Sequence, residues 1–161
     1  MSVDSSQFRE ALSRYATGVT IITALMPDGR PAGMTVSAFS SLSLDPPLVL
    51  VCPAKTVSSL KAFTEGAHFA VNILSEEQQQ LSVAFSLPTT NKFDHAEFET
   101  WATGVPIIKG CLANLECSRQ AVHDGGDHMI VVGRVDRVAI AGQGAPLTYW
   151  RGAYRRISNV A

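Results

Sequence analysis

The 161-residue chain is long enough for one domain with a substantial hydrophobic core. Hydrophobic residues make up 46% of it and charged residues only 17%, which indicates a compact globular protein that buries part of its surface in an oligomer. A net charge of −1 without a basic run argues against nucleic-acid or membrane-surface binding. We expect a cytoplasmic protein, because residues 1–6 lack signal-peptide features and no apolar run reaches the ~20 residues that cross a bilayer.

The cysteines and histidines show no metal-ligand spacing. Cys52, Cys111 and Cys117 are an odd number, which we interpret as free thiols buried as small hydrophobic side chains in a reducing compartment. The four histidines likewise lack paired spacing, so the sequence predicts no metal site.

The first third of the chain predicts one helix followed by strands. Apolar residues at helical spacing predict an amphipathic helix over residues 7–16. Residues 19–25 and 32–38 flank Pro27-Asp28-Gly29, which predicts a β-hairpin. The apolar run over 48–52 predicts a strand inside a sheet, since it is uninterrupted by polar residues.

The remaining chain mixes strands with one clear helix. Residues 68–74 alternate as a strand, and Ser75 to Gln78 is a capping box that predicts a helix. Residues 86–104 lack periodicity and predict an irregular loop that covers a site or lies in an interface. Strands are expected over 113–120 and 129–138, joined by 122–128.

These elements do not form a βαβα series. A hairpin near the start and strand-rich blocks at both ends predict a mainly β domain, an antiparallel barrel with peripheral helices. No repeat or linker divides the chain, so we expect one domain over residues 1–161.

One stretch carries a face of uncharged hydroxyls. A strand at this position places Thr35 and Ser37 on one face and Met34, Val36 and Ala38 on the other. Hydroxyls without charge suit a neutral hydrogen-bonding ligand better than a metal or a phosphate. The alternative is a half-exposed strand whose hydroxyls face water.

A second stretch has the donors that a phosphate needs. We expect a helix to start near Thr56, where its first backbone N–H groups lack partners and its dipole attracts an anion. Lys55 adds a positive charge, and Ser58 and Ser59 add hydroxyl donors. The alternative is that Thr56 merely caps the helix and Lys55 is solvated.

His128 follows Gly125-Gly126-Asp127 at the entrance of a strand, where a ligand can reach an imidazole that titrates near physiological pH. The alternative is a turn histidine with one structural hydrogen bond. Other sites are excluded, because the chain has no Gly-x-Gly-x-x-Gly, no Gly-x-Ser-x-Gly and no phosphate-binding P-loop motif.

The segment from Gly33 to Pro47, GMTVSAFSSLSLDPP, resembles the signature of the short-chain flavin reductases, the reductase components of two-component flavin-dependent monooxygenases. The resemblance covers roughly residues 7–157, and five blocks in register with the segment make it specific. These blocks are Ala16-Thr17-Gly18-Val19, Val71-Asn72-Ile73-Leu74-Ser75, Asn91-Lys92-Phe93, Gly126-Asp127-His128 and Tyr149-Trp150-Arg151-Gly152.

This resemblance implies a split β-barrel of antiparallel Greek-key type that binds FMN or FAD. It also implies a homodimer with flavin sites near the subunit interface. Such enzymes take a hydride from NADH or NADPH onto flavin and release reduced flavin to a partner oxygenase. The absence of nucleophile motifs agrees with this activity, because hydride transfer between two stacked rings needs no protein nucleophile.

The resemblance also assigns site residues. Met34, Thr35, Val36, Ser37, Ser40 and Ser41 would line the isoalloxazine and ribityl chain. The rest of the ribityl chain and the phosphate would contact Cys52, Pro53, Ala54, Lys55, Thr56, Ser58 and Ser59. Phe85 and the following loop would flank the flavin. The nicotinamide nucleotide would meet His128, as the catalytic-site residue, together with Tyr149 and Arg151.

Two other functions remain open at this stage. One is a flavin carrier or sensor without turnover. The other is a flavoprotein that reduces a different acceptor, such as a cobalamin, with flavin as a bound prosthetic group. The sequence does not choose between FMN and FAD or between NADH and NADPH, and it does not name the partner oxygenase.

Overall fold

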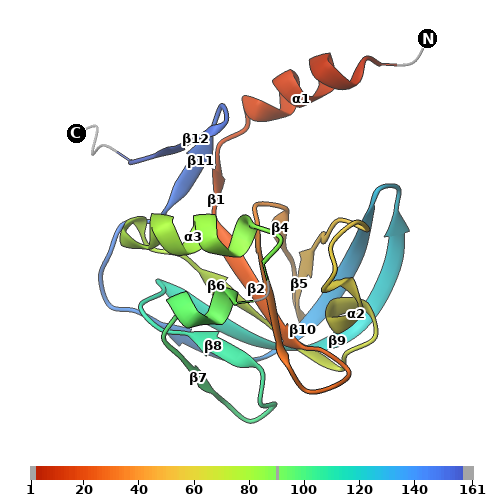
Figure 1. The fold of residues 1–161 in the computed structure, drawn as a ribbon, viewed down its shortest axis with the longest axis vertical. Coiled ribbons are helices and arrows are strands. Elements are labelled where there is room, and N and C mark those ends of the chain that lie inside the picture. The colour runs from red at the N-terminus through yellow and green to blue at the C-terminus, as the bar shows by residue number, and fades with distance from the viewer. Residues whose placement is uncertain (1–2, 90, 158–161) are drawn as a thin grey trace.

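A seven-stranded antiparallel sheet organises the protein, for which the computed structural model describes residues 3–89 and 91–157 (Figure 1). The strands lie in the order β3-β2-β6-β9-β10-β5-β4. In that order their bounds are Pro31–Val36, Thr20–Leu25, His68–Ile73, Ala113–Gly125, His128–Ile140, Pro47–Val51 and Phe39–Leu44. The predicted mainly β, antiparallel split-barrel class is confirmed.

The sheet curls because its two edge strands follow each other in the chain. Only Ser37 and Ala38 separate the end of β3 from the start of β4, so Val36 and Phe39 can be at most about 11 Å apart. A flat sheet would hold these edges about 29 Å apart, over six interstrand steps of about 4.8 Å. The edges therefore meet at residues 37–38 without pairing along their length, which makes the barrel split.

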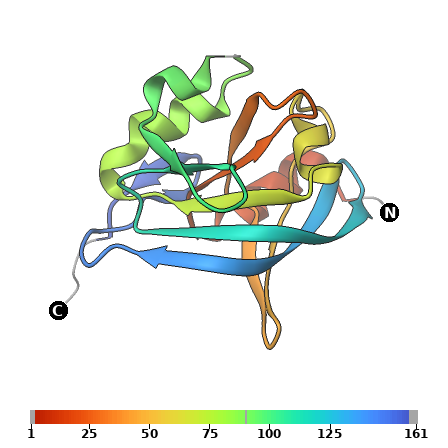
Figure 2. The same cartoon turned by 90° about the horizontal axis from the view of Figure 1, so that it is seen from below.

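Two hairpins, β2–β3 and β9–β10, supply four of the seven strands of the barrel. β2 and β3 pair with Ile22 opposite Met34, as the turn at residues 27–29 predicts. β9 and β10 are longer than predicted and appear in Figure 2 as long curved strands. The expected loop over residues 122–128 is wrong, since only Gly126 and Asp127 separate the two strands. Gly126 has φ 83°, a conformation that glycine adopts without strain.

The helices differ from prediction at their ends. Helix α1 spans Ser5–Ser13, where Asp4 caps it by accepting from the Ser6 and Gln7 N–H groups, and none of its residues is buried. The helix expected near Thr56 is α2, but it begins at Leu60 and has five residues. Turn hydrogen bonds from the Val57 N–H to the Ala54 carbonyl and from the Leu60 N–H to the Val57 carbonyl hold the preceding segment instead.

The capping box at Ser75 is confirmed and precedes a 3₁₀ turn (η1, Glu76–Gln78) and helix α3 (Gln79–Ser86). Residues 86–104 are only partly irregular. They contain a 3₁₀ turn (η2, Lys92–His95) and strand β7 (Phe98–Thr100), which pairs with β8 (Pro106–Ile108). The prediction of a loop is wrong at residues 98–100, because β7 is a short strand whose partner, β8, lies outside the 86–104 segment.

A small separate sheet joins the two ends of the chain. It consists of β1 (Thr17–Gly18), β11 (Thr148–Trp150) and β12 (Ala153–Arg155). Figure 1 shows α1 projecting away from the barrel beside this sheet. Among the described residues, no helix has the length and apolar character to cross a membrane.

Hydrophobic clusters fill both faces of the sheet. One lies inside the barrel with Phe63 of α2 and Phe69 of β6, and another lies beneath α3 with Phe85. Cys111 and Cys117 are buried free thiols as predicted, and burial raises their pKa values to about 11 and about 12. Cys52 departs from the prediction, because it is only half-buried.

Asn72 joins four segments from a fully buried position on β6. Its Nδ2 donates to the Ile21 carbonyl at 2.9 Å, and its Oδ1 accepts from the Ile108 N–H at 2.9 Å and from Asn114 Nδ2 at 2.8 Å. These bonds help to attach β8 to the sheet, together with those from Asn114 Nδ2 to the Ile108 carbonyl at 3.0 Å and from Thr23 Oγ1 to the Pro106 carbonyl at 2.5 Å.

We expect Asn72→Ala to destabilise the fold by about 3–5 kcal/mol, because several buried polar groups lose their partners at about 1–3 kcal/mol each. For a chain of this length the melting temperature should fall by roughly 10 °C. Thermal unfolding followed by circular dichroism measures this. Asn91→Ala, at an exposed position, is the control and should melt within a degree or two of the wild type; equal melting of the two variants would contradict the role of Asn72.

Candidate functional site

A cavity of about 600 Å³ opens where the barrel is split. Its walls come from β3, the segment after β5, the end of α3 with the loop that follows, and the start of β10. This volume is typical of small-molecule and cofactor sites. The lining residues are Met34, Thr35, Val36, Ser37, Ala38, Cys52, Ala54, Thr56, Val57, Ser58, Ser59, Phe85, Ser86, Leu87, Pro88, Lys92 and His128.

The edge of β3, rather than one of its faces, borders the cavity. Residues 34–38 line it consecutively, although successive side chains of a strand point to opposite faces. β3 pairs only with β2, so its other edge leaves backbone N–H and C=O groups without strand partners. Thr35 lines the cavity, and its Oγ1 donates to the Ser82 carbonyl of α3 at 2.6 Å, so this hydroxyl proton is already engaged.

The segment after β5 supplies hydroxyl groups, as the sequence predicts. Thr56, Ser58 and Ser59 line the cavity, and within the described residues their hydroxyls make no hydrogen bond to the protein. Pro53 is buried and does not line it.

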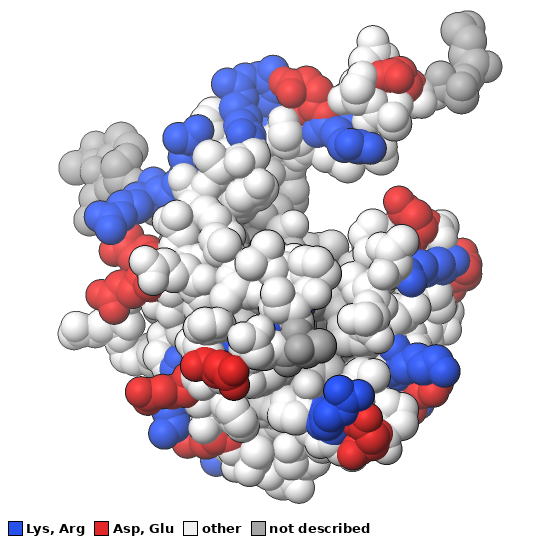
Figure 3. Space-filling model, viewed as in Figure 1, with Lys and Arg blue, Asp and Glu red and all other residues white. Residues whose placement is uncertain are grey.

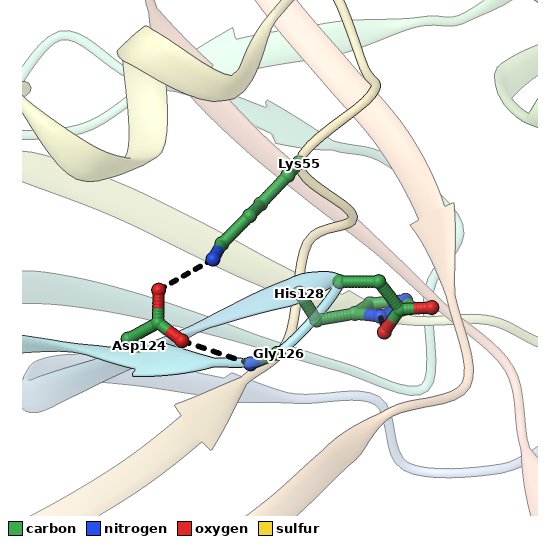
Figure 4. Close-up of polar contacts among 5 residues, drawn as sticks. Lys55, Asp124, Gly126 and His128 are labelled. Atoms are coloured by element: carbon green, nitrogen blue, oxygen red, sulfur yellow. Dashed lines mark hydrogen bonds and ion pairs between the residues drawn. The ribbon is translucent and has the colours of Figure 1, made fainter.

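Lys55 also lies outside the cavity lining. Its Nζ forms an ion pair with the Asp124 carboxylate on β9 (Figure 4). The hydrogen bond from Lys55 lowers the pKa of Asp124, an exposed group, below its ordinary value. Asp124 also accepts from the Gly126 N–H at 3.0 Å, so this carboxylate joins Lys55 to the β9–β10 turn.

His128 lines the cavity, at the position that the sequence singles out. Its Nδ1 lies 2.7 Å from Asp127 Oδ1, and a backbone bridge pairs His128 with Ala54. The hydrogen bond from His128 lowers the pKa of Asp127. Since Nδ1 is engaged, Nε2 is the nitrogen that remains for a ligand.

The segment after Phe85 supplies a further wall, as the resemblance implied for Phe85 and the loop that follows it. Phe85 is fully buried, and the lining residues that the sequence did not assign one by one are Ser86, Leu87, Pro88 and Lys92. Lys92 Nζ donates to the Phe85 carbonyl at 3.0 Å and to the Gly33 carbonyl at 3.2 Å. The only sequence signal for this lysine was its block Asn91-Lys92-Phe93. Ala38 and Val57 were also missed, since neither has a functional group.

A second cavity of about 720 Å³ adjoins the first and shares Ser37, Ala38 and Cys52 with it. It lies between α1, β4, β5 and the β11–β12 hairpin, and it is lined by Ser40, Tyr149 and Arg151 among others. Three predicted site residues, Ser40, Tyr149 and Arg151, therefore line the second cavity and not the first. Ser41 is exposed and lines neither cavity.

Charge is scarce on the face that carries α3. Figure 3 shows Lys, Arg, Asp and Glu side chains around the periphery and a broad uncharged area in the middle. The free strand edge, three uncommitted hydroxyls and one lysine match a neutral ring system with hydrogen-bonding edges and an anionic tail. A planar heterocycle that carries a phosphate has this chemistry, so the cavity suits a ligand of this class.

The chain belongs to the flavin reductase like domain family, which matches residues 12–158. It is 49% identical to the FMN reductase (NADH) SmoA of Agrobacterium fabrum, over 96% of this chain and 87% of the relative. It is 42% identical to HsaB, the reductase subunit of a flavin-dependent monooxygenase of Rhodococcus jostii, over 97% of this chain and 80% of the relative.

A solved NADH:FAD oxidoreductase of Streptomyces globisporus, in complex with NAD and FAD fragments, has the same fold. Its TM-score is 0.92 with 32% identity, over 100% of this chain and 99% of that chain. The resemblance predicted from sequence is thereby confirmed, and this chain is an oxidoreductase of the flavin reductase class.

Cys52 provides a probe of cavity occupancy. Its thiol lines the cavity, whereas Cys111 and Cys117 are buried. Burial raises the pKa of all three thiols, and only the thiolate reacts, so labelling should be slow and confined to Cys52 in the folded protein. We expect saturating FMN to slow maleimide labelling at least several-fold, as measured by intact mass.

Cys52→Ala is the control for this experiment and should take up no label until the protein unfolds. A labelling rate at Cys52 that does not change with FMN would place the flavin outside this cavity.

Proposed function

We propose that this protein is an NADH-dependent flavin reductase that supplies reduced flavin to a flavin-dependent monooxygenase. The observation that carries the proposal is the 600 Å³ cavity along the free edge of β3, in a chain of this family. The names of the relatives support NADH as the donor and an oxygenase as the recipient.

The lining residues fit a flavin. Backbone groups at the edge of β3 over Met34 to Ser37 would bind the polar edge of the isoalloxazine, while Phe85 would support the wall behind it. The hydroxyls of Thr56, Ser58 and Ser59 would bind the ribityl chain and the phosphate end. When bound, the flavin supplies the hydride-accepting chemistry, and the protein contributes binding, orientation and a shaped cavity.

The nicotinamide side is assigned to His128. Asp127 holds the imidazole at the wall of the cavity with Nε2 available, which suits an orienting hydrogen bond to the dinucleotide. Tyr149 and Arg151 border the adjoining cavity, so they would contact a more distant part of the dinucleotide. The backbone of Arg151 is held there in part by its N–H group, which donates to the Ser13 carbonyl.

A homodimer in the cytoplasm completes the proposal. Helix α1 has no buried residue and exposes Phe8 and Leu12, and Tyr15, two residues beyond its end, is 76% exposed. An amphipathic helix in this state favours a partner surface that covers it. The second cavity lies against this helix, so a second subunit would border the Tyr149 and Arg151 region.

Anaerobic mixing of the protein with each pairing of NADH or NADPH with FMN or FAD tests the function, with loss of nicotinamide absorbance as the readout. We expect turnover, with NADH preferred. Flavin binding without any oxidation of NADH would favour the carrier or sensor. Stoichiometric flavin that copurifies and passes electrons to a different acceptor, such as a cobalamin, would favour the prosthetic-group alternative.

We expect His128→Ala to lower kcat/KM for NADH by about 5- to 100-fold, because one orienting hydrogen bond is lost. The dissociation constant for flavin should stay within about twofold of the wild-type value. Steady-state kinetics with varied NADH, together with flavin fluorescence titration, separates the two effects. His123→Ala, at an exposed position on the same hairpin, is the matched control and should keep wild-type kinetics. Weak flavin binding with normal NADH kinetics would move His128 to the flavin.

We expect light scattering to report a dimer at micromolar concentration. The interface of such a stable dimer would bury about 1,200–2,000 Å² in total. Replacing Leu12 with Glu places a charge on the exposed apolar stripe of α1 and should shift the protein toward the monomer. A wild-type monomer with full activity would contradict the proposed dimer.

A further inference from the structure

The turn that carries His128 is held against the segment that follows β5. Residues 53–55 and 127–129 are joined by two backbone hydrogen bonds and one bridge. These contacts are the Lys55 N–H to the Asp127 carbonyl at 2.9 Å, the Met129 N–H to the Pro53 carbonyl at 2.9 Å, and Ala54 opposite His128. They continue the pairing of β5 with β10 in the same register, in which Val51 lies opposite Val131. The orientation of His128 therefore depends on how firmly this turn is held to residues 53–55.

Lys55 adds a side-chain contact to the strand on the other side of β10. Its Nζ forms an ion pair with Asp124 near the end of β9, 69 residues away in the chain (Figure 4). β10 lies between β9 and β5 in the sheet, so the pair spans the start of β10 from one neighbour to the other. The second carboxylate oxygen of Asp124 accepts from the Gly126 N–H at 3.0 Å. One carboxylate thus contacts both the turn and the segment after β5.

Global stability does not account for this ion pair. The Lys55 side chain is 36% exposed and that of Asp124 is 73% exposed, and exposed pairs add little to the free energy of unfolding. What the pair restrains is a two-residue turn whose next residue is His128. A hydrogen bond from Nε2 to a ligand weakens steeply when its angle departs from linear, so a tilt of the turn would weaken it. The geometry therefore favours an orienting role over a stabilising one.

We propose that Lys55 and Asp124 form a latch that orients His128 toward the nicotinamide dinucleotide. This inference rests on the proposed function, because it concerns the residue assigned there to the dinucleotide. Neither Lys55 nor Asp124 lines the flavin cavity or the cavity beside it. Both are therefore positioning residues that act through the turn, and for Lys55 this role replaces the flavin-phosphate contact that the resemblance implied.

Hydrogen exchange of the ligand-free protein tests the latch without any turnover. The variants are Lys55→Met and Asp124→Asn, which each remove one charge with little change of shape. We expect amide exchange in peptides that cover residues 53–55 and 122–129 to become several-fold faster in both variants, because the backbone bonds there open more often. Peptides from β2 and β6 should exchange as in the wild type, and melting temperatures should stay within about 2 °C.

Steady-state kinetics then tests whether the latch acts through His128. At saturating flavin, both variants should raise KM for NADH by roughly 3- to 10-fold with kcat within about twofold, because the imidazole is kept but misaligned. Lys55→Arg keeps the charge and should behave like the wild type. In a His128→Ala background, Asp124→Asn should have no further effect, because the side chain that the latch orients is gone. Dissociation constants for FMN and riboflavin, measured by flavin fluorescence, should match the wild type.

Asp28→Asn and Lys61→Met are the matched controls. Asp28 forms an exposed ion pair with Arg30 in the β2–β3 turn, and Lys61 is an exposed lysine of α2. Neither lies in the β9–β10 turn or beside it in the sheet, so both control variants should keep wild-type exchange at that turn and wild-type kinetics.

Unchanged exchange at the turn in Lys55→Met and Asp124→Asn would overturn the latch. Faster exchange with wild-type NADH kinetics would overturn its role in orienting His128, and so would an equal loss of kcat/KM with and without His128. Weaker binding of FMN, but not of riboflavin, in Lys55→Met would return Lys55 to the flavin phosphate. A wild type that oxidises no NADH would instead refute the proposed function, while the exchange result would still show whether the latch exists.

Discussion

The geometry of this protein depends on the two-residue connection between β3 and β4. Because Ser37 and Ala38 must bridge strands at opposite edges of a seven-stranded sheet, the sheet curls until those edges meet. The edges converge at one corner and stay unpaired beyond it. The same residues therefore produce the barrel, its split and the wall that the two large cavities share.

An unpaired strand edge is ordinarily a risk of aggregation, and proteins cover or interrupt such edges. Here α3 and the loop after it lie over the edge of β3, and Lys92 ties this loop to the strand through two carbonyls. The cover leaves a space rather than a tight contact. A ligand with its own hydrogen-bonding edge could occupy this space and satisfy the backbone, as proposed for the flavin ring.

The electrostatics of the site follow from how its charges are paired. Asp124 neutralises Lys55, and Asp127 engages His128, so both carboxylates of the β9–β10 turn have basic partners. Lys92 is different, since it meets only carbonyl dipoles and loses solvation on burial. A reductase of this kind needs no nucleophile or metal from the protein, and its side chains need only hold two ligands in contact and in the correct orientation.

The sequence by itself determined most strands of the large sheet, the β2–β3 hairpin and the capping box of α3, because these depend on local pattern and turn chemistry. Its motifs identified the family, and it singled out His128 at the entrance of a strand. It did not predict the short strands β1, β7, β8, β11 and β12. The tertiary structure alone decided that the edge of β3 borders the cavity while Thr35 bonds to Ser82. It also decided that Lys55 pairs with Asp124, 69 residues away, and that Lys92 enters the cavity. The physical reason is that the partner of a charge or a strand edge is chosen by long-range packing, which local periodicity does not encode.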